Sequence, residues 1–492
     1  MRMHLAFLLL LCSALPAQLA AQITPHTLAY APGKSITLSL PSGLNINVAA
    51  SGLHRVRFFA QAPDGRIFVT GMYNLADNSQ GSVFILDGWN AQTHTFARVE
   101  HYLDHLRNPN NLAFYTDERG QSWMYLPLTD KLLRYKYNAG DMHPSVAPEV
   151  LIRFPDYGLN YKYGGWHLTR TVAIAKLHGQ TRVYVTAGSS CNYCQEREVL
   201  RAALVSMNPD GSGQQVLSHG LRNAVDLKFV PDLDGGAIFA SNMGDDHLGD
   251  KLPEDTFFEL DSKAHPGPIA FSLPANCADN AACVAAMVPN YGWPTCYFAN
   301  GKPVHDTTPL PQMPAPGDPG TEAERPTRTK TGAAQDDSVY GAYGKQKGIA
   351  AAGTNLSAGG GNSSLPDPNA ALGKAPAPLS VCRDVPAAYT AFAAHSSPLG
   401  LAYFGSDNPQ LHGSFLVALH GAGHPRIGTG YRLVRFTPGD RTPRDFMTGF
   451  LTFANGRPIV HGRPCGVLRV GPDSFLLTDD YLGLIYFIGP NT

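Results

Sequence analysis

Histidine, arginine and asparagine side chains recur along this chain at one kind of position, just before or at the start of an apolar run. The six positions are Arg57, Asn110, His167, Arg222, His395 and Arg463. An imidazole titrates near neutral pH and can take or give a proton. A guanidinium offers donors in a fixed fork that matches carboxylates. If the fold brings these positions together, they form a site for a polar, anionic ligand; the alternative for some of them is solvation of their loops.

The sequence around these residues repeats six times as a turn, an apolar strand, a Gly/Asp turn and a second apolar strand. The copies begin at Gly52, His105, Trp166, Gly220, Ser396 and Ile459. Repeats of roughly 50 to 60 residues are typical of radial or stacked architectures. We therefore predict an all-β protein, a six-bladed β-propeller with four strands in each blade. In such a ring the innermost strands all begin on one face near the axis.

Composition agrees with a turn-rich all-β chain, because 50 Gly and 39 Pro accompany short runs such as RIFVT and RVYVT. One segment departs from this pattern. Residues 303–375 are rich in Pro, Gly and Ala, which predicts a long loop insertion, with a flap over the site as the alternative. Residues 22–492 are otherwise expected to form a single propeller domain.

The first 21 residues have a basic start, an apolar centre and small residues at the end, which predicts a cleaved signal peptide. A membrane anchor is the alternative, but the apolar run is short for a bilayer span. We expect a periplasmic or secreted protein with no membrane span. The formal net charge of -1 gives no indication of nucleic-acid binding.

The chain has eight cysteines, of which Cys12 lies in the predicted signal. In an oxidising compartment the closely spaced pairs are expected to form local disulfides. A redox or metal role for the CNYC stretch is the alternative. A bond between Cys296 and Cys382 would close a long loop and leave Cys465 without a partner cysteine. The two close pairs and the remaining three are Cys191/Cys194, Cys277/Cys283, and Cys296, Cys382 and Cys465.

Nine motifs in a fixed order resemble one known family. They are GGWHLTR (164–170), AGSSCN (187–192), NPDGSG (208–213), GLRNAVDL (220–227), GDDHLGDKLPED (244–255), NYGWP (290–294), HSSPLGLAYF (395–404), ALHGAGHPRIGTGYRLVRF (418–436) and DFMTGFL (445–451). Together they resemble the glucose/sorbosone dehydrogenase family, soluble propellers that use pyrroloquinoline quinone (PQQ). The resemblance runs from about Gly52 to the end of the chain, apart from the insertion.

The resemblance implies oxidation of a sugar by hydride transfer to the quinone. His167 matches the family's histidine base, and Arg222 with Asn223 matches the quinone contacts, Arg222 also assisting catalysis. Further cofactor contacts are expected at Arg57, Arg170, His395 and Arg426. The resemblance also implies a calcium ion, which we assign to Gly244, Asp245 and Asp246 because hard oxygen ligands suit this ion.

The expected partners are a small sugar substrate and an external electron acceptor, a cytochrome or a quinone, because the chain has no haem motif. Two other functions remain open. One is a metal-dependent propeller hydrolase of the lactonase type, which needs acidic ligands converging on the axis. The other is a propeller that binds carbohydrate or protein without catalysis.

Overall fold

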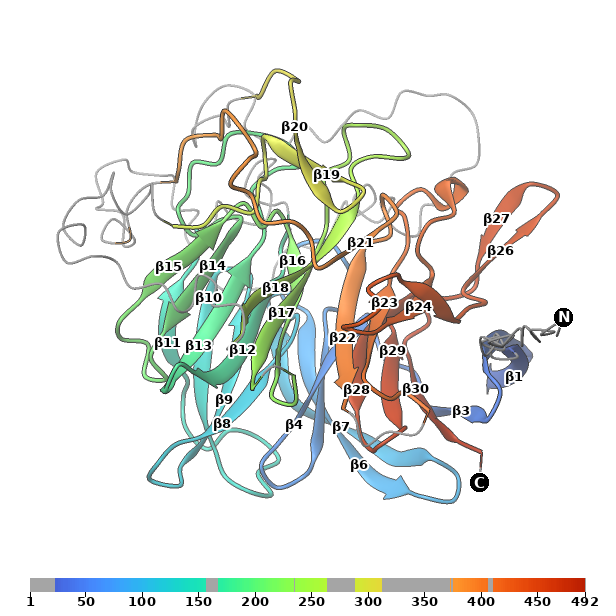
Figure 1. Ribbon diagram of the computed structural model, residues 1–492. Coiled ribbons are helices and arrows are strands. Elements are labelled where there is room, and N and C mark those ends of the chain that lie inside the picture. The colour runs from blue at the N-terminus through green and yellow to red at the C-terminus, as the bar shows by residue number, and fades with distance from the viewer. Residues whose placement is uncertain are drawn as a thin grey trace, which may run out of the picture.

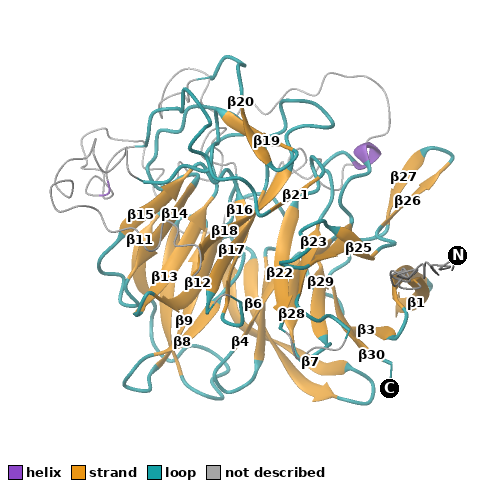
Figure 2. Cartoon of the chain, in the orientation of Figure 1, coloured by secondary structure: helices purple, strands orange, loops and turns teal. Residues whose placement is uncertain are grey.

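The fold is a ring of six four-stranded antiparallel sheets, as the repeats predict (Figure 1, Figure 2). The computed structural model describes residues 23–155, 167–233, 235–262, 288–311, 372, 375–405 and 410–491. The predicted signal peptide and most of the predicted insertion lie outside these residues.

The first three blades follow one another along the chain, each with its innermost strand first. Blade 1 comprises β4 (Val56–Gln61), β5 (Ile67–Gly71), β6 (Gly81–Asn90) and β7 (Thr95–Leu106). Blade 2 comprises β8 (Ala113–Thr116), β9 (Ser122–Leu128), β10 (Lys131–Tyr137) and β11 (Glu149–Arg153). Blade 3 comprises β12 (Arg170–Leu177), β13 (Gln180–Ala187), β14 (Ala203–Met207) and β15 (Gln215–His219).

The other three blades keep this order, but two of them take their outer strand from a distant part of the chain. Blade 4 comprises β16 (Ala224–Val230), β17 (Ala237–Asn242), β18 (Asp255–Ser262) and β21 (Thr390–Phe392). Blade 5 comprises β22 (Pro398–Phe404), β23 (Ser414–Leu419), β24 (Arg432–Phe436) and β25 (Arg444–Met447). Blade 6 comprises β28 (Pro464–Arg469), β29 (Phe475–Asp479), β30 (Leu484–Pro490) and β3 (Leu44–Ala50).

The ring closes because β3, from the start of the chain, pairs with β30 at its end. Ile46 lies opposite Ile488 in this pairing. The innermost strands contact one another around the whole ring, in the order β4, β8, β12, β16, β22, β28 and back to β4. Each innermost strand is an edge of its own sheet, and its packing against the neighbouring innermost strands protects that edge.

Adjacent blades are joined by a recurring hydrogen bond. At five of the six junctions a hydroxyl at the end of a second strand donates to a backbone carbonyl at the start of the next innermost strand. The donors are Thr70, Thr129, Thr186, Ser241 and Thr478, at 2.5–3.0 Å from the carbonyls of Asn110, Leu168, Ala224, Leu399 and Arg57. Because the acceptors lie at the strand starts, these bonds fix the loops that carry the candidate site.

The core lies between the blades, so the middle strands are buried on both faces. Every residue of β17 and of β23 is buried. Phe239, Phe257 and Phe415 pack together between blades 4 and 5 with ring centroids 4.8–5.4 Å apart. Strands buried on both faces read as continuous apolar runs, which explains the pattern of the repeats.

Three two-stranded hairpins extend from the ring: β1 (Ile23–Ala31) with β2 (Lys34–Pro41), β19 (Cys296–Ala299) with β20 (Lys302–His305), and β26 (Leu451–Ala454) with β27 (Arg457–Val460). The β19–β20 hairpin lies above the blades in Figure 1. A short 3-10 helix, η3 (Pro425–Ile427), precedes β24. Within the described residues we find no helix with the length and hydropathy needed to cross a bilayer.

Two of the predicted disulfides are present. Cys191 bonds to Cys194, and Cys296 bonds to Cys382 across 86 residues. Cys465 is a free thiol, fully buried at the axis with Phe58, and burial raises its pKa to about 12. The predicted Cys277/Cys283 pair lies outside the described residues.

Candidate active site

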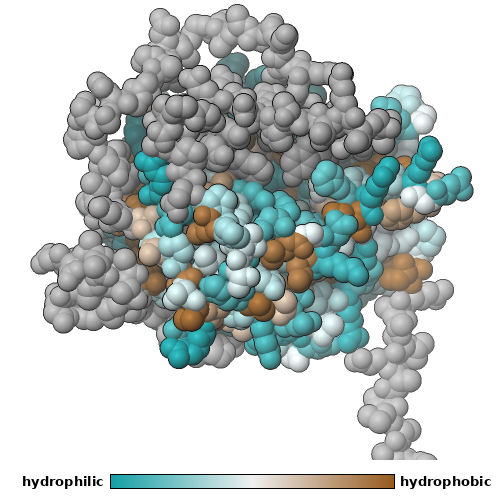
Figure 3. Space-filling model, turned by 90° about the horizontal axis from the view of Figure 1, so that it is seen from above, coloured by the Kyte–Doolittle hydropathy of each residue, from teal (hydrophilic) through white to brown (hydrophobic). Residues whose placement is uncertain are grey.

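A part of the predicted site residues gathers at the end of the propeller that carries the β19–β20 hairpin, the upper end in Figure 1. Loops that lead into innermost strands meet there with loops that leave second strands. Blade 3 contributes His167, before β12, and Ser189, after β13. Blade 4 contributes Arg222 and the 244–246 loop, and blade 5 contributes His395. Seen from above, the described part of this end mixes polar and apolar side chains (Figure 3).

His167 is held in an unusual backbone conformation, with φ at +45°, in the left-handed region. Such a conformation is costly for a residue with a Cβ and persists only where neighbours enforce it. Arg170 supplies part of that support, because its Nη1 donates to the carbonyls of His167 at 2.8 Å and Thr169 at 2.9 Å. Gly188 supplies room, because a Cβ there would overlap the Cβ of His167.

The hydrogen bonds of His167 assign its tautomer. Its Nδ1 lies 2.9 Å from the Ser189 Oγ and 3.1 Å from the Ser189 carbonyl. The Ser189 hydroxyl donates its own proton to the Cys191 carbonyl at 2.6 Å. Both Ser189 oxygens therefore accept from Nδ1–H, and the lone pair of the neutral ring lies on Nε2.

The surroundings also keep the His167 ring neutral. Burial lowers the pKa of His167 well below its ordinary value, and the charges of Arg222 and Arg201 lower it further. The hydrogen bond from Nδ1 to Ser189 opposes this shift only in part. At neutral pH the imidazole is thus an unprotonated base.

Arg222 is almost fully buried and uses its fork to join two loops. Its Nε donates to the Asn192 carbonyl at 2.9 Å, and its Nη2 donates to the Asn192 Oδ1 at 2.6 Å. Its Nη1 donates to the Gly244 carbonyl at 2.5 Å. Asp246 faces the same guanidinium, 3.5 Å from Nη2. This cation is therefore held in a fixed position by the two loops.

Asn223 follows Arg222 and is buried, with 6% of its surface exposed. Its Nδ2 contacts the Met243 sulfur at 3.4 Å. Its Oδ1 has no hydrogen-bond partner among the described residues. A Cβ on Gly188 would lie 2.7 Å from this oxygen and would also overlap His167. Asn223 Oδ1 and His167 therefore both lie beside Gly188. The buried Oδ1 can accept a hydrogen bond from a ligand there.

His395 forms an ion pair with Asp246. Its Nδ1 lies 3.0 Å from the Asp246 Oδ1, and its Nε2 donates to the Gly249 carbonyl at 2.8 Å. The bond to Asp246 raises the pKa of His395 to about 9, against the effect of burial. Burial alone would raise the pKa of Asp246, but His395 and Arg222 lower it. At neutral pH His395 is a cation and Asp246 an anion.

Asp255 connects the blade 4 part of the site to the blade 5 part. Its Oδ1 accepts from the Gly244 amide and its Oδ2 from the Ser397 amide, both at 2.7 Å. Burial raises the pKa of this carboxyl to about 7. The residue lies at the start of β18, in the last part of the motif that begins at Gly244, and it sets the spacing between the 244–249 loop and His395.

The other acidic residue of the 244–246 loop, Asp245, lies next to a second histidine, His247. Its Oδ1 lies 2.7 Å from the His247 Nδ1, while the His247 Nε2 lies 2.7 Å from Asp306. Tyr193 stacks on the His247 ring with centroids 3.8 Å apart. Burial would lower the pKa of His247, but the two carboxylates raise it.

The calcium assignment to Gly244, Asp245 and Asp246 stays a prediction, and the geometry gives each of these groups another partner. The Gly244 carbonyl accepts from Arg222, Asp245 pairs with His247, and Asp246 pairs with His395. The described residues contain no group of three His, Cys, Asp or Glu side chains placed to hold a metal.

Arg57 lies in a separate polar cluster of blades 1, 2 and 6. Its Nη2 donates to the Asn110 Oδ1 at 3.0 Å, and its Nη1 lies 3.1 Å from Asp480. Burial alone would raise the pKa of Asp480, but His420 and the neighbouring arginines hold it well below the ordinary range. Asn110 reaches on to blades 3 and 4 through Thr171 and the Val225 carbonyl.

Two predicted cofactor contacts have different surroundings from the rest. Arg170 is buried and touches the backbone of His167, so its position suits support of the histidine. Arg426 is exposed on η3, and no contact of the described residues joins it to His167 or Arg222. Their roles as cofactor contacts stay predictions.

Four residues of the site were missed from the sequence: Ser189, Asn192, Asp255 and His247. Ser189 and Asn192 lie in the AGSSCN motif, which marked the family resemblance without revealing a contact. Their positions directly after the second strand of a blade could have indicated a role, because the ends of second strands lie at the same end of the ring as the starts of innermost strands. His247 and Asp255 lie in the GDDHLGDKLPED motif, which likewise marked the resemblance without revealing their contacts.

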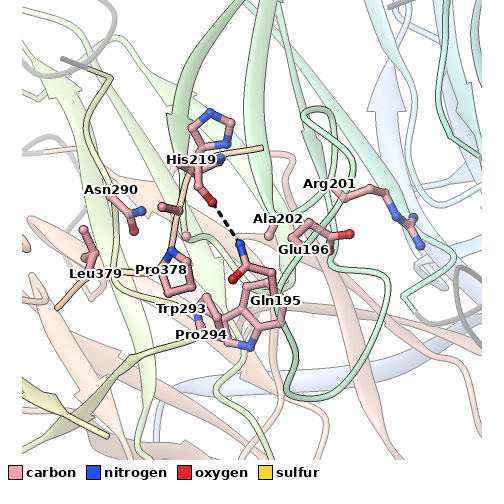
Figure 4. A pocket seen from close by; sticks show the side chains of 13 residues that line it. Gln195, Glu196, Arg201, Ala202, His219, Asn290, Trp293, Pro294, Pro378 and Leu379 are labelled. Carbon is pink, nitrogen blue, oxygen red and sulfur yellow. Dashed lines mark hydrogen bonds between the residues drawn. The ribbon is translucent and has the colours of Figure 1, made fainter. Parts of the chain in front are cut away.

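A narrow pocket adjoins the site behind the Cys191–Cys194 loop (Figure 4). Its lining includes Glu196, Arg201, His219 and Trp293. Figure 4 shows Gln195 placed centrally, with Trp293 and Pro294 beneath it. The pocket meets the site through the Trp293 indole, whose Nε1 donates to the Asn192 carbonyl at 3.1 Å.

Comparison with solved structures agrees with the resemblance that the motifs gave and confirms the propeller. The holo form of the PQQ domain of pyranose dehydrogenase from Coprinopsis cinerea matches with a TM-score of 0.55 and 15% identity, covering 92% of this chain and 97% of that one. Two structures of Trichoderma reesei carbohydrate-active enzymes of family AA12 are similar. The iodide structure has a TM-score of 0.55 at 14% identity, covering 92% of this chain and 97% of that one. The calcium structure has 0.54 at 15%, covering 92% and 96%.

No protein-family model matches the sequence, and no curated protein matches it either.

Proposed function

We propose that this protein is a PQQ-dependent oxidoreductase that oxidises a sugar, with His167 as the general base. The observation that carries the proposal is the pairing of a neutral, tautomerically fixed imidazole with a buried arginine fork at the mouth of the ring. The likeness to the PQQ domain of pyranose dehydrogenase supports the cofactor and the substrate class.

The residues of the site fit an anionic cofactor. The cations Arg222 and His395 lie in the same cluster, opposed there by the anion Asp246. The buried Asn223 Oδ1 provides an acceptor for a donor on the incoming group. Gly188 keeps the space beside His167 free of a side chain. Arginine forks suit carboxylates, and PQQ carries three of them.

When bound, PQQ would supply the acceptor for the hydride that leaves the sugar carbon. His167 removes the hydroxyl proton of that carbon through Nε2, the ring atom that carries the lone pair. Ser189 accepts from Nδ1 at the other edge of the ring, so that Nδ1 keeps its proton throughout. The positive charge that develops on the imidazole is stabilised by the two Ser189 oxygens that accept from Nδ1. Arg222 would bind an anionic group of the cofactor.

Calcium stays a prediction for the 244–246 loop, where the Gly244 carbonyl, Asp245 and Asp246 contact Arg222, His247 and His395 in the described arrangement. We derive no step through this ion. It enters only as an arm of the experiment, in which PQQ is titrated in calcium and in a chelator.

The proposed partners are a small sugar and an external electron acceptor, a cytochrome or a quinone. We propose a periplasmic or secreted location, in keeping with the Cys191–Cys194 and Cys296–Cys382 disulfides, since such bonds persist in oxidising compartments.

The experiment is a calorimetric titration of the purified protein with PQQ, followed by dye reduction with a panel of aldoses. We expect saturable PQQ binding and dye reduction by at least one sugar. Binding without reduction by any sugar would overturn the substrate class, and absence of binding in both calcium and chelator would overturn the cofactor.

A further inference from the structure

The four-residue ring closed by the Cys191–Cys194 disulfide lies directly against both proposed active groups. Its residues follow β13, and both cysteines are buried, with 4% and 2% of their surface exposed. Neither sulfur touches His167 or Arg222 through a described hydrogen bond. The contacts run instead through the backbone of Cys191 and through both polar groups of Asn192.

The first of these contacts controls His167. The Cys191 carbonyl accepts the Ser189 hydroxyl proton at 2.6 Å. That bond turns the Ser189 Oγ into an acceptor for the His167 Nδ1, 2.9 Å away. A shift of the Cys191 carbonyl would free the serine proton, and Ser189 could then donate to Nδ1 and reverse the tautomer.

The second contact controls Arg222. Asn192 accepts twice from this guanidinium, through its backbone carbonyl and its Oδ1, at 2.9 and 2.6 Å. The same Oδ1 accepts the Asp246 amide at 3.0 Å. One asparagine thus fixes the cation and the adjoining loop, which only a residue with two acceptors this close together can do.

The ring is anchored from behind as well. Trp293 donates to the Asn192 carbonyl at 3.1 Å and packs with both cysteines. Tyr193 donates from its hydroxyl to the Thr308 carbonyl at 2.8 Å, and its ring stacks on His247. Within this frame the disulfide removes the remaining backbone freedom between residues 191 and 194.

We propose that the Cys191–Cys194 ring is the positioning element for both His167 and Arg222, with Asn192 as its contact residue. The catalytic part of this inference rests on the proposed function, whereas the effect on the His167 ring does not. Because both sulfurs are buried, the disulfide is structural and does not take part in thiol–disulfide exchange, as CxxC motifs often do. Opening the disulfide would let the proton on the His167 Nδ1 move to Nε2. It would also release Arg222 from Asn192.

The test compares three variants with the wild type. Asn192→Ala removes the Oδ1 and leaves the disulfide in place, and Asn192→Asp restores an acceptor. Cys191→Ser/Cys194→Ser opens the ring. The matched control is Cys296→Ser/Cys382→Ser, which opens the second described disulfide, at β19, whose cysteines have no described hydrogen bond to His167.

The first readout is the tautomer of the neutral His167 ring, measured by NMR from its two ring-nitrogen shifts in the protein without cofactor. We expect the proton on Nδ1 in the wild type and in the control, and a proton on Nε2 or a mixture of tautomers in the Cys191→Ser/Cys194→Ser variant. An unchanged His167 tautomer in the opened ring would overturn the proposal. This readout does not depend on whether the protein binds PQQ.

The second readout is PQQ affinity. Asn192→Ala should weaken it about ten- to a hundredfold, as expected for a lost hydrogen bond to a charged group, and Asn192→Asp should recover most of it. Equal affinity in wild type and Asn192→Ala would contradict the role of Asn192. If the opened ring fails to fold, Asn192→Ala decides the matter, since its disulfide is intact. Failure of the wild type to bind PQQ would instead count against the proposed function.

Discussion

The Nδ1 of His167 lies 2.9 Å from the hydroxyl of Ser189, and that hydroxyl is already committed as a donor elsewhere. This relationship makes the serine an acceptor and gives the histidine a defined tautomer. A catalytic imidazole needs its lone pair on the atom that meets the substrate, and the protein sets this from the opposite side of the ring.

Ser189→Ala should lower kcat roughly fivefold to tenfold and leave KM nearly unchanged, because the Nδ1 proton loses one of its two acceptors. Steady-state kinetics with the best sugar measures this. Ser190→Ala is the matched control, since that neighbouring buried hydroxyl accepts from Arg201 and not from His167. Equal losses of kcat in both variants would show that the effect is general to the loop.

Arg222→Lys should weaken PQQ binding at least about tenfold, because a point charge cannot engage Asn192 and Gly244 together as the fork does. Calorimetry against the wild type gives the ratio. The same exchange at Arg426, which is exposed on η3, should change the affinity less than about twofold. A larger loss at Arg426 than at Arg222 would reverse the assignment of the cationic contact.

Gly188→Ala should destabilise the protein by about 1–3 kcal/mol and abolish the site, because its Cβ would overlap His167 and crowd the Asn223 Oδ1. Chemical denaturation measures the free energy of unfolding. Gly439→Ala is the control, since a Cβ there meets no atom within 4 Å. A Gly188→Ala protein as stable as the control would contradict the described packing around His167.

The ion pair of His395 with Asp246 should make stability depend on pH in a defined window. The His395 pKa is about 9 in the folded protein and near 6.5 when unfolded, so its contribution is complete below pH 6.5 and is lost as pH rises through 9. His395→Gln should therefore lower the free energy of unfolding by about 1 kcal/mol at pH 6 and by little at pH 10, allowing for the half-exposed Asp246.

Denaturation of the wild type and His395→Gln across this range measures the difference. Asp255, whose pKa is raised to about 7, interacts with His395, so its titration near pH 7 adds to the difference and the comparison rests on the values at pH 6 and pH 10. A His395→Gln difference that stays constant from pH 6 to pH 10 would show that His395 is not held as a cation.

The ring itself could be predicted from the sequence because the apolar runs repeat in pairs. Each repeat copy became the innermost and second strands of one blade, as β4 with β5 and β28 with β29 show. The hydroxyls that join the blades were also visible, since Thr70 and Thr478 end such runs. Their role was not predicted, because it depends on which blade lies next in space.

The site was predictable only in part, for a reason of the same kind. Strand-start positions revealed His167, Arg222 and His395, which the structure brings to one end of the ring. What each side chain touches is decided by contacts between distant loops, and these leave no periodic signal. Asn192 faces Arg222 across 30 residues, and Asp246 faces His395 across 149. Arg57 lies in a separate cluster for the same reason.

The most direct test of the account is the absorption of the quinone after a sugar is mixed without oxygen with the PQQ-loaded protein, comparing the wild type with His167→Gln. We expect both proteins to bind PQQ with similar affinity. The quinone absorption should fall within seconds in the wild type and at least about a hundredfold more slowly in His167→Gln, the loss expected for a general base. Equal rates in the two proteins would remove His167 from the mechanism, and a wild type that cannot be loaded with PQQ would contradict the account at its centre.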